Sequence, residues 1–362
     1  MRPAAWRRKR GTSWLLAVGL IGCDDSSFEL ASGDGDTHGQ VETTPEVEDR
    51  LPKDETSSPE TSDRVPKDET SNRETADRPR PPTDIPTVRL PNPPIVLPPQ
   101  VVYDLPAAQT LTDRPHWRWI ATQPSLSKSR FIPSDTDPAP TMELNVAGDW
   151  VFELRAWEDA ESLAEIVWTQ TISVISGQGL HIELLWDTPG DEDQTDEGTE
   201  LGTDLDLHFV HLEYAVGADF DGDGDGVDDP WFHQLFDTFW FTPNPNWGTL
   251  DSTADDNPSL DRDDTDGAGP ENLSLTLGTN GLAYGIGVHY WTDHGFGVST
   301  ATVRIYWDGA LVEQHSQLMT ERDLWYVGTI DWAAELFTLK VDAAGAHYVA
   351  PGYAHPNFDI SE

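Results

Sequence analysis

The most specific chemical signal in the sequence is an alternation of Asp and Gly across residues 221–229. Calcium takes about six to eight oxygen ligands, and glycines between the acids permit the tight turn that aims successive carboxylates inward. The segment predicts a Ca²⁺ loop whose ligands are Asp221, Asp223, Asp225, Asp229 and the carbonyl oxygen of Val227. A flexible acidic loop is the alternative, because Phe232 stands where a final acid would complete the cage.

Two other acidic segments predict a second cation cluster. Strand alternation across 203–209 places Asp204, Asp206 and His208 on one face and three apolar residues on the other. We expect these acids to meet others at one end of a β-sandwich and to share metal ions, the full set being Asp187, Asp204, Asp206, Asp261, Asp263 and Asp266. The alternative is that they form only Asx-turns and loop caps. We expect His208 to be a hydrogen-bonded strand residue, because oxygen-rich sites suit Ca²⁺ rather than Zn²⁺.

The charge balance of the acidic region also favours a bound cation. Residues 187–271 contain 20 Asp and 5 Glu but only one basic residue, Arg262. Uncompensated carboxylates repel one another, and a divalent cation relieves that repulsion. We therefore predict Ca²⁺ as the cofactor of this protein.

The sequence contains none of the common catalytic motifs. It has no G-x-S-x-G and no H-E-x-x-H, and its single cysteine, Cys23, lies in the N-terminal segment. Paired carboxylates can hydrolyse glycosidic bonds, but the acids here lie in Gly/Asp turn patterns. We expect none of them in an apolar setting that would raise its pKa. The sequence favours a non-catalytic protein, with a carboxylate-based glycosidase as the least favoured alternative.

Three tryptophans close to the predicted Ca²⁺ loop suggest a second kind of site, namely Trp231, Trp240 and Trp247. Exposed aromatic rings offer flat, amphipathic surfaces for a ligand. A carbohydrate-binding surface protein is therefore the alternative function. Burial in a core is the competing interpretation, since small β-sandwiches use buried tryptophan routinely.

The first 23 residues have the layout of a secretory signal. Residues 1–10 carry five basic residues and no acid, an apolar stretch follows at 13–22, and Cys23 comes next. Leu20–Cys23 resembles the bacterial lipobox, in which cleavage before the cysteine accompanies acylation of its thiol. The resemblance implies a signal peptide at 1–22 and a lipid anchor on Cys23 that attaches the mature chain to a lipid bilayer. An ordinary signal peptide with an incidental cysteine is the alternative.

The overall charge limits the partners. The 362 residues include 22 Lys and Arg against 65 Asp and Glu, a formal net charge of −43. Nucleic acid is excluded as a partner, because phosphate binding needs clustered basic residues. Envelope proteins or polysaccharide remain as candidate partners. The cell envelope is the predicted location, with the outer membrane or cell surface favoured over the inner membrane.

Residues 23–97 are predicted to form a disordered tether. They are rich in Ser, Thr, Asp, Glu and Pro, and a 14-residue repeat returns residues 50–57 as 64–71. Such a segment cannot bury enough apolar surface to offset the entropy of ordering. Charged, proline-rich linkers are semi-extended, so the tether would hold the folded part away from the membrane.

The next segment, 98–176, is predicted to be a small antiparallel β-sandwich. Short strand patterns separated by turn signals lie at 116–120, 141–145, 150–157 and 169–174. Val146–Leu154 resembles the characteristic strand of PKD-type Ig-like domains, with Trp150 where tyrosine is usual. The resemblance implies an Ig-like fold with tryptophan packed in its core.

A second, larger sandwich is predicted over 177–345, followed by a C-terminal tail at 346–362. Its strand patterns lie at 180–186, 203–209, 272–277, 284–290, 301–307 and 324–330. No long stretch keeps a 3.6-residue period, which argues against helices. The expected fold is therefore all-β, with two tandem antiparallel β-sandwich domains.

The second segment contains, in this order, the motifs Leu-x-Trp-Asp, Asp-x-Asp-Leu-His and Leu-Asp-x-Asp-x-Thr-Asp-Gly. Their order resembles that of YfaP-type domains from bacterial secreted proteins and lipoproteins. The loop at 221–229 resembles the calcium repeats of thrombospondin type 3 and dockerin modules. Together these features predict a cell-envelope lipoprotein that acts as a calcium-stabilised binding or structural module without catalysis.

Overall fold

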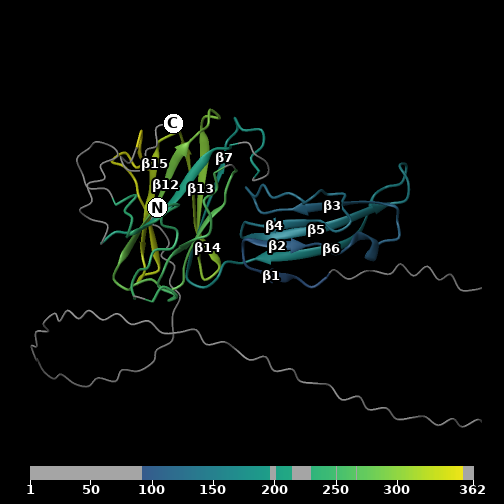
Figure 1. Ribbon diagram of the computed structural model, residues 1–362, viewed down its shortest axis with the longest axis horizontal. Coiled ribbons are helices and arrows are strands. Elements are labelled where there is room, and N and C mark those ends of the chain that lie inside the picture. The colour runs from purple at the N-terminus through teal and green to yellow at the C-terminus, as the bar shows by residue number, and fades with distance from the viewer. Residues whose placement is uncertain (1–91, 196–200, 214–229, 250, 266, 354–362) are drawn as a thin grey trace, which may run out of the picture. The chain divides into compact units, whose positions relative to one another are not determined.

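The computed structural model describes residues 92–195, 201–213, 230–249, 251–265 and 267–353. The chain divides into two compact units, and every described residue lies in the second unit, Pro82–Glu362. These residues form strands and a single 3₁₀ turn at Ala108–Thr110, with no α-helix among them (Figure 1). The prediction of an all-β fold built from antiparallel sheets is therefore confirmed.

Six strands form the part that we call the N-terminal sandwich. Their bounds are β1 Ile95–Leu97, β2 Val101–Asp104, β3 His116–Thr122, β4 Thr141–Leu144, β5 Gly148–Trp157 and β6 Glu165–Val174. Four strands form one sheet in the order β1-β6-β5-β3, and β2 pairs with β4 in a second sheet. Every pairing is antiparallel except that of β1 with β6, which is parallel.

Alternation along β5 builds the core of the N-terminal sandwich. Phe152 and Leu154 are fully buried on one face of this strand, whereas the intervening residues are partly exposed. Trp119 and Trp150 lie in the same core, and the indole N–H of Trp150 donates to the carbonyl oxygen of Val146 at 3.0 Å. These two tryptophans therefore pack the core, as the sequence predicted, and do not form a surface for ligands.

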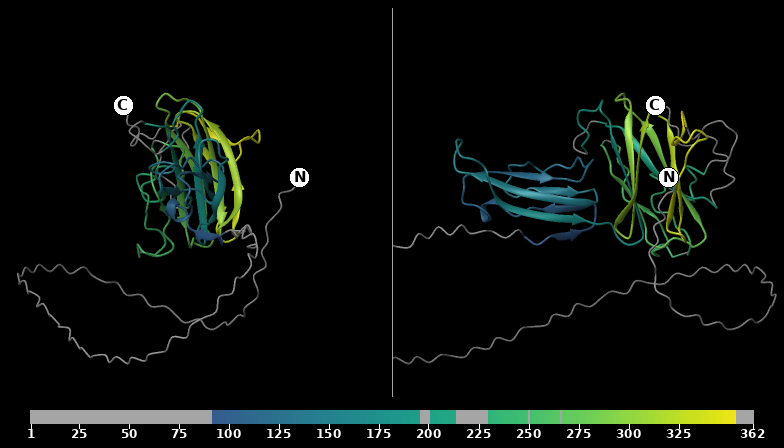
Figure 2. Two further views of the ribbon diagram at one scale, coloured as in Figure 1. Left: turned by 90° about the vertical axis from the view of Figure 1, so that its right-hand side faces the viewer. Right: turned by 180° about the vertical axis from the view of Figure 1, so that it is seen from behind.

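Eleven strands form the second part of the fold, which we call the C-terminal sandwich. Their bounds are β7 Leu180–Asp187, β8 Asp204–His211, β9 Asp237–Thr238, β10 Ser259–Leu260, β11 Glu271–Leu275, β12 Ala283–Thr292, β13 Ser299–Trp307, β14 Ala310–Met319, β15 Leu324–Asp331, β16 Leu336–Leu339 and β17 Tyr348–Ala350. One sheet has the order β10-β11-β7-β13-β14, and the other has the order β16-β15-β12-β8-β9, with β17 beside β15. Figure 2 shows these two sheets as separate layers.

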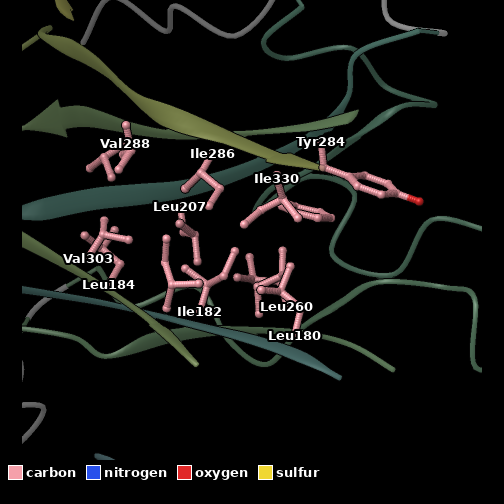
Figure 3. Close-up of a cluster of buried hydrophobic side chains, with 14 of the residues drawn as sticks. Leu180, Ile182, Leu184, Leu207, Leu260, Tyr284, Ile286, Val288, Val303 and Ile330 are labelled. Carbon is pink, nitrogen blue, oxygen red and sulfur yellow. The ribbon is translucent and has the colours of Figure 1, made fainter. Parts of the chain in front are cut away.

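The main core lies between these two sheets. Figure 3 shows Leu184 and Val303 from one sheet facing Leu207 and Val288 from the other, all of them fully buried. β8 contributes Leu205, Leu207 and Phe209 to this core, as strand alternation predicted. The remaining face of β8 therefore points out of the sandwich.

That outer face of β8 and β12 is covered as well. A second group of buried apolar residues packs on it, consisting of Val210, Trp231, Phe232, Phe239, Leu324, Ala350 and Tyr353. Glycine in β12 makes room for this layer, since a Cβ atom on Gly287 would lie 2.7 Å from Cζ3 of Trp231. β8 is consequently buried on both faces along its whole length.

Several strands differ from the sequence prediction, and the short strands β2, β9, β10 and β16 lie outside the predicted strand patterns. Ile95–Leu97, which the sequence assigns to the tether, pair with β6 as β1. Tyr348–Ala350, assigned to the C-terminal tail, pair with β15 as β17. The sequence patterns also miss β14, which is mostly exposed and so lacks the alternation that marks a half-buried strand. In each case a neighbouring strand supplies the order that the local sequence does not signal.

Replacing Gly287 by alanine should destabilise the protein by about 1–3 kcal/mol, because the added methyl group overpacks the layer between β12 and Trp231. Gly177→Ala is the matched control, since a Cβ atom at Gly177 meets nothing within 4 Å. Urea unfolding followed by tryptophan fluorescence measures both variants. Equal unfolding midpoints for the two variants would show that Trp231 does not pack closely against Gly287.

Candidate metal centre

The candidate site begins on the covered outer face of β8. Asp204 and Asp206 lie on this face, two residues apart, and their side chains are almost completely buried. β8 is held between β12 and β9, and Asp206 is directly opposite His289 of β12 in the register. The sheet therefore fixes the positions of two carboxylates that water does not solvate.

A third carboxylate comes from the loop between β10 and β11. Asp263 brings a carboxylate oxygen to Asp204 and Asp206, and the three ligand atoms lie within 4.8 Å of one another. Gly269 allows this loop to approach β7 closely, since its φ is +73° and a Cβ atom would lie 2.6 Å from the carbonyl oxygen of Leu184. The trio contains two buried residues and one exposed residue, so the cluster lies at the edge of the covered region.

Two further acids lie beside this aspartate trio. Glu271, at the start of β11, is fully buried, and its Oε2 accepts a hydrogen bond from the backbone N–H of Leu207 at 2.6 Å. Its Oε1 accepts one from the backbone N–H of Asp264 at 3.3 Å. The Glu271 carboxylate thus connects a strand of one sheet to a strand of the other. Asp264 is itself buried, with Nη2 of Arg262 3.7 Å from its Oδ2.

Burial and mutual repulsion raise the pKa values of these acids. Burial is the main cause of the rise in the pKa of Asp204 to about 8, with added repulsion from Asp263 and Asp264. The pKa of Asp206 is also raised, by burial and then by Asp204, and that of Glu271 by burial and then by Asp206. The sequence prediction that no acid has an apolar setting is therefore wrong. The loops and the second apolar layer that desolvate these residues are not visible in the local Asp/Gly pattern.

The arrangement can hold a metal ion. Oδ1 of Asp204 and Oδ2 of Asp206 are buried and have no hydrogen-bond partner among the described residues. A cation between the three aspartates would replace the missing donors and cancel the repulsion that raises their pKa values. The donor atoms are all carboxylate oxygens, which suit hard cations such as Ca²⁺, Mg²⁺ and Mn²⁺.

The structure brings together only part of the predicted ligand set. Asp187 lies elsewhere, with the ammonium of Lys128 3.1 Å from its Oδ1. Asp261 accepts hydrogen bonds from the backbone N–H and the side-chain amide of Asn272, which is the loop-capping role that the sequence left open. Asp266 lies outside the described residues, as do the five predicted ligands Asp221, Asp223, Asp225, Val227 and Asp229.

The tryptophans proposed as a carbohydrate surface are largely internal. Trp231 and Trp247 are only 2% and 5% exposed, respectively, and belong to the two apolar clusters of the C-terminal sandwich. Trp240 is partly buried and packs against the cluster that contains Trp231. Core packing is therefore the correct interpretation for Trp231 and Trp247. The rings do not form an exposed coplanar pair.

Several residues of the site were not predicted as ligands or neighbours. Asp264 lies within the Leu-Asp-x-Asp-x-Thr-Asp-Gly motif, and Glu271 follows that motif. His289 lies on β12, and Asp237 lies in the segment that covers β8. His208 is hydrogen-bonded through Nδ1 to Oδ2 of Asp237 at 2.7 Å, which confirms the strand role expected for it.

Comparison with protein-family models and with curated proteins finds no match to this chain. The likeness to PKD-type and YfaP-type domains therefore remains a prediction from short motifs. Among the described residues, no helix has the length and apolar character needed to cross a bilayer.

With divalent cations chelated, the protein should lose stability as the pH rises from about 4 to about 8. The folded state keeps a proton on Asp204, whose pKa is about 8, whereas the unfolded chain releases it near its ordinary value of 3.8. Asp204→Asn should make this slope shallower by up to about 1.4 kcal/mol per pH unit. Thermal melts in EGTA at several pH values measure the slope. The exposed Asp255→Asn is the control, and a wild-type slope in the Asp204 variant would contradict the assignment.

Proposed function

We propose that this chain is a lipid-anchored, calcium-stabilised binding or structural module of the bacterial cell envelope, without catalytic activity. The observation that carries the proposal is the trio of Asp204, Asp206 and Asp263, whose ligand oxygens lie within 4.8 Å of one another. Two of these three acids are buried, and each of them has a carboxylate oxygen without a hydrogen-bond partner in the part of the chain that the structure describes. A protein gains little from such an arrangement unless a cation compensates it.

Calcium fits the site better than magnesium. Three aspartates supply up to six oxygens, and Ca²⁺ accepts six to eight at variable angles, with carboxylates bound through one or both oxygens. Magnesium demands a near-regular octahedron and retains several waters. Two of the three aspartates come from a rigid strand and the third comes from a loop, a combination that favours the ion with the less strict geometry.

The membrane anchor is proposed from the sequence alone. Cys23 is the only cysteine and lies at the position where a lipobox places the acylated residue. Both Cys23 and most of the 23–97 segment lie outside the described residues. Acylation at this cysteine would leave the two sandwiches on a tether, where envelope proteins or polysaccharide are the available partners.

A glycosidase is the weaker candidate. The raised pKa values of Asp204 and Asp206 meet one requirement of a general acid. Both carboxylates are nearly completely buried, however, and a glycosidic bond must lie between an acid and a second carboxylate. A metal ion, which needs no such space, is the better occupant.

Calcium should raise the melting temperature of the protein by about 5 °C or more when it is present at a hundredfold excess over its dissociation constant. Asp204→Asn combined with Asp263→Asn should remove much of this increase, because two of the three ligands lose their charge. The measurement is a thermal melt in EGTA, CaCl₂ and MgCl₂. If part of the increase remains in the double variant, Asp221→Asn, Asp223→Asn and Asp225→Asn are added to it. Loss of the remaining increase would assign that part to the predicted Ca²⁺ loop at 221–229.

Asp255→Asn is the control for this experiment, since it removes one exposed acid from the same region. It should leave the calcium response unchanged. Matched ionic strength in NaCl separates binding from screening of the net charge. An equal increase in NaCl and CaCl₂ would reject a specific calcium site.

Cys23→Ser should give a longer, unprocessed precursor that takes up no acyl label, because the lipobox reaction needs the thiol. Labelling with an alkynyl fatty acid in a Gram-negative host, followed by gel mobility, makes the measurement. Ser13→Ala is the control within the apolar stretch and should be processed normally. Continued labelling of the Cys23 variant would rule out this anchor.

A further inference from the structure

A cavity of about 270 Å³ is lined by loops of both sandwiches, all of them within the compact unit Pro82–Glu362. The loop between β3 and β4, together with β4 itself, forms one wall. The loops between β7 and β8 and between β10 and β11 form the other. Small-molecule pockets usually measure about 300–1,000 Å³, so this cavity suits a small ligand. Its polar lining includes Lys128, Arg130, Glu143, Asn145, Thr195 and Arg262.

The cavity gathers basic side chains in a part of the chain that has few of them. Residues 98–362 contain 47 Asp and Glu but only nine Lys and Arg. Three of these nine, Lys128, Arg130 and Arg262, line this one cavity, together with a single carboxylate from Glu143. A hollow lined mainly by charges of one sign concentrates ions of the opposite sign. The lining therefore favours an anionic ligand in a protein that is otherwise strongly negative.

Neighbouring residues hold two of these cations in place without covering them. The ammonium of Lys128 is 3.1 Å from Oδ1 of Asp187. Nη2 of Arg130 donates a hydrogen bond to Oγ1 of Thr195 and lies 3.6 Å from Oδ1 of Asp193. The side chain of Lys128 remains 34% exposed and that of Arg130 remains 42% exposed. A ligand in the cavity can therefore reach both positive charges.

Arg262 adds a third cation from the other wall. Its Nη1 is 3.7 Å from Oε2 of Glu143, its Nη2 is 3.7 Å from Oδ2 of Asp264, and its side chain is 28% exposed. A guanidinium group binds a carboxylate through two parallel N–H···O hydrogen bonds, which a lysine ammonium cannot do. The cavity thus offers two guanidinium groups and one ammonium group to the anionic part of a ligand.

The other polar groups of the lining suit hydroxyl groups. The carboxylate of Glu143 accepts hydrogen bonds. Oδ1 of Asn145 accepts one from Oγ of Ser127 at 3.0 Å, so the N–H donors are the part of this amide that a ligand can use. A phosphate group carries close to two negative charges at neutral pH, and Glu143 would repel it more strongly than a carboxylate. The lining therefore matches a ligand with one negative charge and several hydroxyl groups.

Buried contacts fix the two walls of the cavity relative to each other. Glu183 of β7 is fully buried, and its Oε1 accepts a hydrogen bond from the backbone N–H of Ala147 at 2.7 Å. Nη2 of Arg304, on β13, donates to the carbonyl oxygen of Ser125 at 2.9 Å, three residues before Lys128. A preformed site loses less conformational entropy on binding than one that assembles around its ligand.

We propose that this cavity binds a sugar acid, such as a hexuronate unit of an acidic polysaccharide. Lys128, Arg130 and Arg262 bind the carboxylate of the sugar. Glu143 and Asn145 bind its ring hydroxyl groups. The inference rests on the proposed function only in taking an envelope polysaccharide as the source of the sugar. It assigns carbohydrate recognition to charged loops rather than to the tryptophans.

D-Galacturonate is the probe for this cavity. The full chain is titrated in EGTA and followed by heteronuclear NMR, because free calcium would bridge the sugar to the acidic loops. D-Galactose, which lacks the carboxylate, and acetate, which lacks the ring, should each bind about tenfold or more weakly than galacturonate. Equal affinity for galactose would overturn the anionic site. Equal affinity for acetate would overturn the assignment to a sugar.

Trigalacturonate distinguishes the two sources of the ligand. It should displace the single sugar if the cavity takes a unit of a polysaccharide. Failure to displace it would overturn the polysaccharide as the source and restrict the cavity to free sugar acids.

Lys128→Gln and Arg130→Gln each remove one cation from the cavity and should weaken galacturonate binding about tenfold or more, since hydrogen bonds to charged groups are the strong ones. Arg118→Gln is the matched control, because Arg118 is a partly exposed cation that pairs with Asp135 at 3.2 Å and is not part of the lining. It should bind as the wild type does. Equal losses in all three variants would assign binding to net charge and overturn the site.

Chemical-shift changes in the wild-type protein test the cavity without any substitution, so a variant that fails to fold does not decide the result. Galacturonate should shift the side-chain amide signals of Asn145, and shifts confined to other regions would overturn the site. Galacturonate binding that needs Lys128 and Arg130 supports the cavity even if calcium has no effect on stability. An absence of galacturonate binding overturns the cavity even if calcium stabilises the protein.

Discussion

The burial of β8 on both faces is the constraint on which the rest of the C-terminal sandwich depends. Its inner face supplies Leu205, Leu207 and Phe209 to the core between the sheets. Its outer face carries Asp204, Asp206 and His208, which are also removed from water. Burying ionisable groups is costly unless each finds a partner. Three parts of the fold lie against β8 at this row of polar side chains. They are the segment around Asp237, the loop that contains Asp263, and Glu271 at the start of β11.

Some polar groups of β8 have a hydrogen-bond partner within the protein, and others have none among the described residues. His208 has Asp237, and the backbone N–H of Leu207 has Glu271, so these contacts hold the covering segment and the opposite sheet in place. Oδ1 of Asp204 and Oδ2 of Asp206 have no hydrogen-bond donor among the described residues. Repulsion from neighbouring carboxylates adds to the effect of burial and raises their pKa values. The same strand thus combines contacts that are complete within the protein with carboxylate oxygens that have no donor among the described residues.

The carboxylate oxygens of β8 that lack a donor among the described residues are the physical basis of the proposed function. Calcium at the aspartate trio would join β8 to the loop before β11. The ion would stabilise the fold at the point where this loop meets β8. Cation binding in this setting acts through folding stability, because a ligand that binds only the folded state shifts the folding equilibrium. An anchored envelope module would gain resistance to unfolding in a calcium-containing medium.

The sequence by itself determined the all-β class, the inward and outward faces of β5 and β8, and the placement of Asp204 and Asp206 on the same face of one strand. These properties follow from residue alternation, which is local. It also indicated that Asp263 belongs near them, through the order of acidic motifs. Only the tertiary structure decided that Asp187 and Asp261 bind other groups and that Trp231 and Trp247 are buried. Glu271, Asp237 and His289 joined the site because strands distant in sequence became neighbours. Desolvation by that packing raised the acid pKa values, an effect that no local pattern carries.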